Sequence, residues 1–273
     1  MLGALVIVFR EVLEAGLIIG IVLAATRGLP GRARFVTLGI LAGLAGACLV
    51  ALFAEAISDA FEGSGQELLN ASVLSAAVVM LMWHNAWMAR HGREMASEMA
   101  AVGRAVSAGT RPMTALAVVV GLAVLREGAE IVLFLYGIVA TGTSGAALLT
   151  GGLLGIAGGA ALSALTYFGL VALPTRHVFT VITVLIALLA AGMAAQAVQY
   201  FDAAGWVDVL GNRVWDSSGY LPQDGIMGRL LHTLIGYTDR PTELQLVTYL
   251  ATLAAMALLT WIAAPRRTAA AAA

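Results

Sequence analysis

Residues 2–25 read LGALVIVFREVLEAGLIIGIVLAA, an apolar stretch with three charges in its middle, at Arg10, Glu11 and Glu14. About 20 mostly apolar residues are enough to cross a bilayer as a helix. A charge in the hydrocarbon region is costly, so charged residues there usually face a protein interior, a partner or water. The stretch therefore predicts a membrane helix whose polar centre is turned away from lipid.

The whole chain has the composition of a membrane protein. Of its 273 residues, 60% are hydrophobic and only 11% are charged, whereas a soluble domain has about 25% charged residues. The 15 basic and 16 acidic residues give a net charge of -1, and this balance lacks the basic surplus that binding to nucleic acid requires. We expect an all-α protein in the lipid bilayer, with no nucleic-acid partner.

Seven apolar stretches are long enough to cross a membrane. The predicted spans are 2–25, 36–58, 68–88, 113–140, 145–173, 178–201 and 244–264. They make up a single transmembrane domain, residues 1–264, in which residues 202–243 form a long outer loop before the seventh helix at 244–264. Residues 265–273 are predicted to be a cytoplasmic tail.

The arginines predict how these spans are oriented. Positive charge in short loops is retained on the cytoplasmic side of a membrane. In a seven-span chain, ten of the 15 arginines fall on one side and three on the other, and the remaining two lie inside spans. We therefore expect a multi-pass protein of the cytoplasmic (inner) membrane, with its N-terminus outside and its C-terminus in the cytoplasm.

The charged motif of the first span occurs again in the fourth. Residues 10–14 read REVLE and residues 126–130 read REGAE, 116 residues later. Spans one to three (repeat one, 1–90) and four to six (repeat two, 113–201) are thus predicted to be two inverted three-helix repeats, because the first and fourth spans cross in opposite directions. Inverted repeats commonly place a binding site near the midplane of the membrane.

The same offset of 116 residues places Gly39 and Gly43 of the second span on Gly155 and Gly159 of the fifth. Glycines four residues apart form a ridge that lets two membrane helices approach closely. We interpret them as packing residues that do not touch a substrate.

Each motif places two glutamates on one face of a helix, since positions three and four residues apart are neighbours there. The arginine of each motif can reach the second glutamate, four residues on. If the two halves pack as an inverted pair, all six charges converge near mid-membrane. The candidate metal ligands are Glu11, Glu14, Glu127 and Glu130, with Arg10 and Arg126 as charge partners.

Three interpretations of this cluster compete. In the first interpretation, the charges form ion pairs that only hold helices together, although buried pairs add little net stability. A cation site is the second: an oxygen-only cluster, with no Cys and no nearby His, suits hard ions such as ferric iron, calcium, magnesium or manganese. An intramembrane hydrolase or metalloenzyme is disfavoured, because neither a G-x-S-x-G nor an H-E-x-x-H motif occurs. The residues alone leave the metal open.

Two secondary features have both a functional and a structural interpretation. Glu55, Asp59 and Glu62 are spaced i, i+4, i+7, and with Glu67 they would form an outer entry site or simply a polar helix end. His84 lies within the third span, where a lone histidine is more often packed or hydrogen-bonded than a metal ligand.

The duplicated R-E-x-x-E motif resembles that of the high-affinity iron permease family, the oxidase-dependent iron transporters of fungi and bacteria. Weaker similarities are the Gly-Ser-Gly-Gln-Glu approach to the third span, the tryptophans near its end, and the outer loop; the residues are Gly63 to Glu67, Trp83, Trp87, Met88, Trp215, Asp216, Gly236, Tyr237, Pro241 and Tyr249.

The resemblance implies an iron permease and not an enzyme, with iron as the transported substrate and no permanently bound cofactor. It implies that the four motif glutamates are iron ligands. It also implies a separate extracytoplasmic oxidase or peroxidase that delivers ferric iron, and a periplasmic iron-binding protein as a further partner. The alternatives are transport of another cation such as lead, manganese or ferrous iron, or a non-transporting membrane metal sensor or scaffold.

Overall fold

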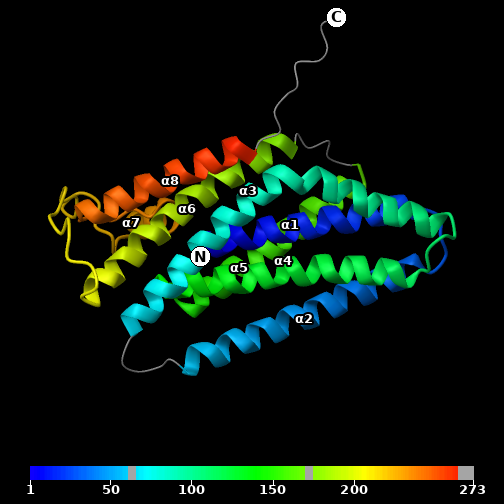
Figure 1. The fold of residues 1–273 in the computed structure, drawn as a ribbon, viewed down its shortest axis with the longest axis horizontal. Helices are drawn as coiled ribbons and strands as arrows, with labels where there is room; N and C mark the ends of the chain where they lie inside the picture. The colour runs from blue at the N-terminus through cyan, green and yellow to red at the C-terminus, as the bar shows by residue number, and fades with distance from the viewer. Residues whose placement is uncertain (61–65, 170–174, 264–273) are drawn as a thin grey trace, which may run out of the picture.

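The computed structural model describes residues 1–60, 66–169 and 175–263. These residues form an all-helical bundle in which the long helices run lengthwise along the molecule (Figure 1). The helices are α1 (Leu2–Ala25), α2 (Arg32–Ala60), α3 (Gln66–Ser107), α4 (Thr114–Ala140), α5 (Gly145–Tyr167), α6 (Thr175–Ala203), α7 (Ile226–Ile235) and α8 (Glu243–Ala263).

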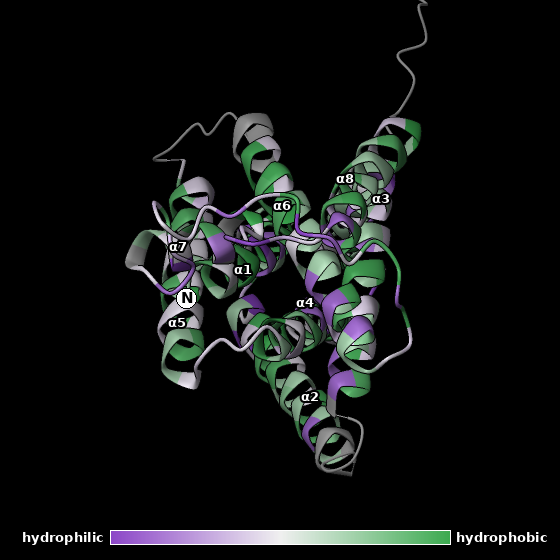
Figure 2. Ribbon diagram, turned by 90° about the vertical axis from the view of Figure 1, so that its left-hand side faces the viewer, coloured by the Kyte–Doolittle hydropathy of each residue, from purple (hydrophilic) through white to green (hydrophobic). Residues whose placement is uncertain are grey.

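Helices α1 and α4, which carry the two charged motifs, occupy the interior of the bundle. Helix α1 packs against α5, α4, α3 and α6, and α4 packs against α2, α1 and α3. Seen along the helices, both lie in the middle, with apolar helices around them (Figure 2). The surrounding helices therefore shield the charges of α1 and α4 from lipid, as the cost of a charge in hydrocarbon requires.

Within the described residues, five helices are long and apolar enough to cross a membrane. The apolar segments are Arg32–Ala56, Glu67–Gly92, Gly145–Tyr167, Thr180–Ala203 and Glu243–Ala263. Large apolar side chains such as Leu41, Phe53 and Leu149 are exposed on α2 and α5, and exposed apolar surface of this kind suits contact with lipid. The protein is therefore an all-α membrane protein. Helices α1 and α4 are not among these five, because each carries three charges in its apolar stretch. They remain spans predicted from the sequence.

Glycines allow two helix pairs, α2 with α4 and α1 with α5, to pack backbone against backbone. A Cβ atom added to Gly43 would lie 2.7 Å from the carbonyl oxygen of Gly121, and one added to Gly155 would lie 2.8 Å from the carbonyl oxygen of Leu5. Both distances are too short for a real Cβ atom, so only glycine fits at these two positions without a shift of the helices. The interpretation of these glycines as packing residues agrees with these contacts.

The two close contacts also correct the register of the glycine match. Leu5 and Gly121 differ by 116 residues, the offset of the charged motifs, whereas the glycines that face them, Gly43 and Gly155, differ by only 112. By its contacts, Gly155 is thus the counterpart of Gly43. The sequence offset pairs Gly43 with Gly159, which lies one helical turn further along α5. The reason is that the segment between motif and glycine is four residues shorter in the second half.

Helix α3 is longer than the predicted span 68–88, and it continues to Ser107. The segment 89–107 is rich in Ala, Arg, Glu and Met and contains no proline, so a helix is locally favoured even where the side chains are too polar for a bilayer. The expected boundary of repeat one at residue 90 therefore lies inside a continuous helix.

The predicted outer loop, 202–243, contains a short helix, α7, and an isolated β-bridge between Arg213 and Thr242. Helix α8 begins directly after Thr242. The Thr242 N–H donates to Oε1 of Gln245 (2.9 Å), and the Gln245 N–H donates to Oγ1 of Thr242 (3.2 Å). This reciprocal capping fixes the start of the helix within one residue of the predicted start of the seventh span, residue 244.

Replacing Gly155 by Ala should destabilise the protein, because the new Cβ would overlap the backbone of α1. We expect a loss of about 1–3 kcal/mol, the usual cost of overpacking, seen as a lower midpoint of thermal unfolding in detergent. Gly152→Ala is the matched control on the same helix, since a Cβ there meets nothing within 4 Å. Equal midpoints for the two variants would contradict the close packing of α1 with α5.

Candidate functional site

The first motif forms a buried ion-pair network within one turn of α1. The Arg10 Nε donates to Oε1 of Glu14 at 2.8 Å, and Arg10 Nη1 lies 3.5 Å from Oε1 of Glu11. All three side chains are buried. The predicted pairing of the arginine with the second glutamate, four residues on, is confirmed.

The second motif, on α4, repeats this pairing in a more open environment. The Arg126 Nε donates to Oε1 of Glu130 at 3.1 Å, and Glu127 and Glu130 are buried. The side chain of Arg126 is 30% exposed, compared with 5% for Arg10. The two motifs therefore share a sequence pattern but not an environment.

Carboxylates from both motifs meet between α1 and α4. One oxygen each of Glu11, Glu127 and Glu130 lies within 4.8 Å of the others. Apart from the longer ion pair of Glu11 with Arg10, no described group donates a hydrogen bond to the carboxylate oxygens of Glu11 or Glu127. Buried acceptors left without donors are costly, and a bound cation would satisfy them. The structure thus brings residues of the two motifs together, as predicted.

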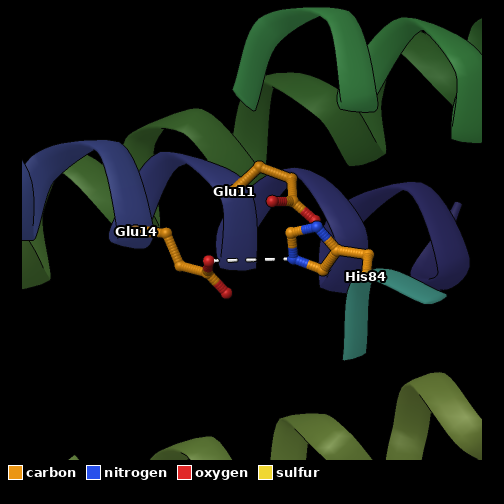
Figure 3. A group of neighbouring side chains, drawn as sticks. All are labelled: Glu11, Glu14 and His84. Atoms are coloured by element: carbon orange, nitrogen blue, oxygen red, sulfur yellow. Dashed lines mark ion pairs between the residues drawn. The ribbon is translucent and has the colours of Figure 1, made fainter. Parts of the chain in front are cut away.

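A histidine from a third helix also enters this cluster. His84 of α3 is 3% exposed, and its Nε2 lies 3.8 Å from Oε2 of Glu14 (Figure 3). Its Nδ1 contacts Oε2 of Glu130. Glu11, Glu14 and His84 form a second group whose ligand atoms lie within 4.8 Å of one another. The expectation of an oxygen-only cluster with no nearby His is therefore wrong, because tertiary packing places α3 beside both motifs.

Helix α3 also supplies the neighbours of Arg126. The Sδ atoms of Met95 and Met88 lie 3.4 and 3.7 Å from its Nη1 and Nη2, and the guanidinium carbon lies 4.4 Å from the ring centre of Trp87. The sequence alone did not predict this contact of Met88. A detectable signal was the spacing of His84, Met88 and Met95 at i, i+4 and i+11, which places them on one face of a helix.

The outer entry site is only partly covered by the structure. Glu55, on α2, and Glu67, in the first turn of α3, are exposed. Asp59 belongs to α2, but its side chain is not described, and Glu62 lies outside the described residues. Within the described part of the chain, no group of three metal-ligating side chains includes Glu55 or Glu67. The entry site stays a prediction.

Arg10→Met should destabilise the protein more than Arg126→Met. Removing one partner of a buried ion pair leaves an uncompensated charge and costs about 3–5 kcal/mol, whereas the more exposed position of Arg126 lets water compensate the loss. Thermal unfolding of the two purified variants in detergent measures the difference. An equal or larger loss for Arg126→Met would show that the contrast in burial has no energetic consequence.

Comparison with known proteins identifies relatives of the chain. Residues 1–267 match the model of the iron permease FTR1 family. The chain is 31% identical over 239 residues to the ferrous iron permease EfeU of Escherichia coli O6:H1 (86% of each chain) and 30% identical over 240 residues to EfeU of Shigella sonnei (86% of each chain). EfeU of Shigella flexneri is 31% identical over 192 residues, which cover 70% of this chain and 81% of the relative. No solved structure matches the chain. The chain therefore belongs to the iron permease FTR1 family, a family of transporters and not of enzymes.

Proposed function

We propose that this protein imports iron across the cytoplasmic membrane through a site built from the glutamates of its two R-E-x-x-E motifs. The observation that carries the proposal is the meeting of Glu11, Glu127 and Glu130 in the interior of the bundle, with buried carboxylate oxygens that lack donors. His84 connects Glu14 to this group, because one ring nitrogen lies near Glu14 and the other contacts Glu130. Membership of an iron permease family supports iron as the cargo.

The architecture that we propose is seven membrane spans, α1 to α6 and α8, arranged as two inverted three-helix repeats and a seventh helix. The parallel contacts of Gly43 with Gly121 and of Gly155 with Leu5 support the repeats. The excess of arginines on one side supports an outer N-terminus and a cytoplasmic C-terminus. Rocking of one repeat against the other is the usual route by which such transporters alternate access to a central site.

The arginines have a role in release under this proposal. Four glutamates alone would bind a multivalent cation very tightly. Arg10 and Arg126 already donate to Glu14 and Glu130, so each guanidinium can stay with its carboxylate as the metal leaves. A fixed, planar cation with several donors suits this exchange better than an ammonium group would.

Two oxidation states of iron are candidates for the cargo. Carboxylate oxygens suit ferric iron, which a separate extracytoplasmic oxidase or peroxidase would deliver, with a periplasmic iron-binding protein as a further partner. Ferrous iron is favoured by two observations: the imidazole of His84 beside the glutamates, and the ferrous iron permease names of the relatives. Import of manganese or lead, or a sensor that binds metal without moving it, are the competing functions.

Glu14→Gln and Glu130→Gln should each reduce iron uptake at least about tenfold, because changes around a metal commonly cost 10–100-fold in affinity or activity. Radioactive iron uptake into iron-starved cells, at equal abundance of protein in the membrane, measures the effect. Glu98→Gln is the control, since Glu98 is an exposed glutamate of α3 distant in sequence from both motifs. Competition by manganese, lead, ferrous and ferric iron identifies the cargo.

Unimpaired uptake in both glutamate variants would refute the proposed site. Loss of folded protein, with normal uptake per remaining molecule, would favour the interpretation of the motifs as structural ion pairs. Binding of iron by the purified protein in liposomes, without flux, would support a sensor or scaffold instead.

The outer acidic residues should affect how iron is collected and not how it is moved. In the double variant Glu55→Gln with Glu67→Gln, we expect slower uptake at low iron concentration and an unchanged maximal rate. The defect should shrink at high ionic strength, because attraction by exposed charges is screened by salt. Uptake curves at two salt concentrations test this, and a defect that is independent of salt would exclude an electrostatic entry site.

A further inference from the structure

We propose that His84 is a direct ligand of the transported ion and that Glu11 is shared by two adjacent ion positions. Glu14 and His84 complete the first position with Glu11, and Glu127 and Glu130 complete the second. This inference rests on the proposed function, which needs only the glutamates. Its new content is a nitrogen ligand and a path of two steps.

One ring nitrogen of His84 is free to bind a metal. His84 is 3% exposed, and its Nε2 has no hydrogen-bond partner among the described residues. A buried imidazole nitrogen left without a partner is costly, and a histidine that served only to crosslink helices would use both nitrogens. The unpaired Nε2 lies on the side of the ring that faces Glu14 (Figure 3).

The other ring nitrogen is held as it is in known metal sites. A histidine that binds metal through one nitrogen almost always donates its other N–H to a carboxylate, carbonyl or water, which fixes the tautomer and the ring orientation. Here Nδ1 of His84 contacts Oε2 of Glu130. A proton on Nδ1 leaves the lone pair on Nε2, the atom that lacks a partner.

The spacing between His84 and Glu14 fits two ligands of one ion. Their nearest atoms, Nε2 and Oε2, are 3.8 Å apart, too far for a hydrogen bond. Two ligand atoms that each lie about 2.1 Å from a metal are separated by about 3–4 Å. The carboxylate of Glu11 supplies the third ligand, since one oxygen of each glutamate and one ring nitrogen of His84 lie within 4.8 Å of one another.

Glu11 links this position to the second one. The same residue belongs to both groups of potential ligands, and neither of its oxygens has a hydrogen-bond donor among the described residues. A carboxylate has two oxygens, so Glu11 can keep one bond to the ion while the remaining ligands exchange. The ion then moves from Glu14 and His84 to Glu127 and Glu130 without losing all of its ligands at once.

The nitrogen ligand also determines which cations the site selects. Imidazole suits first-row transition-metal ions, whereas magnesium and calcium prefer oxygen ligands alone. A position with one imidazole and two carboxylates therefore favours ferrous iron and related divalent ions over magnesium and calcium. The class of ion that fits this position is thus a divalent transition-metal ion of borderline softness.

The decisive experiment examines manganese bound to the purified full-length protein in detergent. Pulsed electron paramagnetic resonance of bound Mn²⁺ detects the ¹⁴N coupling of a directly coordinated imidazole. We expect this coupling in the wild-type protein, its loss in His84→Gln, and its retention in His91→Gln. His91 lies on the same helix and stacks on Trp87, so it is a matched control for the loss of an imidazole from α3.

Bound manganese with only oxygen ligands in the wild-type protein would overturn the inference and leave the glutamate site intact. Retention of the nitrogen coupling in His84→Gln would overturn it as well. Failure of the proposed function gives a different result, namely normal iron uptake by Glu14→Gln and Glu130→Gln. Absence of the coupling in the wild-type protein would overturn the inference even if His84→Gln does not fold.

Selectivity provides a second measurement. In proteoliposomes, we measure the ratio of calcium to iron at which iron uptake is halved. This ratio should be at least about tenfold lower in His84→Gln than in the wild-type protein. The variant His91→Gln should keep the wild-type ratio. An unchanged calcium ratio in His84→Gln would show that the imidazole does not select the ion.

Discussion

The arrangement of the whole bundle depends on the need to keep six charges, in two R-E-x-x-E motifs, away from lipid. Each arginine donates to a glutamate one turn away, which lowers the cost of burial, but the carboxylates of Glu11 and Glu127 accept no hydrogen bond from the described residues. Helices that carry such charges cannot face lipid, so α1 and α4 lie inside and the apolar helices surround them. The site and the fold therefore follow from one constraint.

The two motifs are not equivalent in the folded protein. Arg10 is buried and contacts the carboxylates of its own helix, whereas Arg126 is partly exposed and also contacts two thioethers and an indole of α3. Its guanidinium thus has uncharged neighbours that hold it more weakly than a second carboxylate would. This difference gives the site two unlike ends, although the motifs have the same sequence pattern.

Helix α3 changes the chemistry expected of the site. Its His84 contacts a glutamate from each motif and converts a cluster of oxygens into a mixed nitrogen and oxygen set. Under the proposed function, this mixed set of potential ligands agrees with the ferrous iron permease names of the relatives. The same helix contacts Arg126 one and three turns further on, so a single face of α3 adjoins both motifs.

The sequence by itself determined the features that depend on local spacing. The apolar stretches predicted the helices α1, α4 and α8 within one residue of their ends, and the i, i+3 and i+4 positions of the motifs predicted the glutamate faces and arginine pairs, because the helical period is local. Only the tertiary structure decided the placement of His84, the neighbours of Arg126 and the one-turn shift between Gly43 and Gly155. These depend on how helices distant in sequence pack against one another. The periodic pattern of a helix shows which residues share a face, but not which distant helix that face contacts.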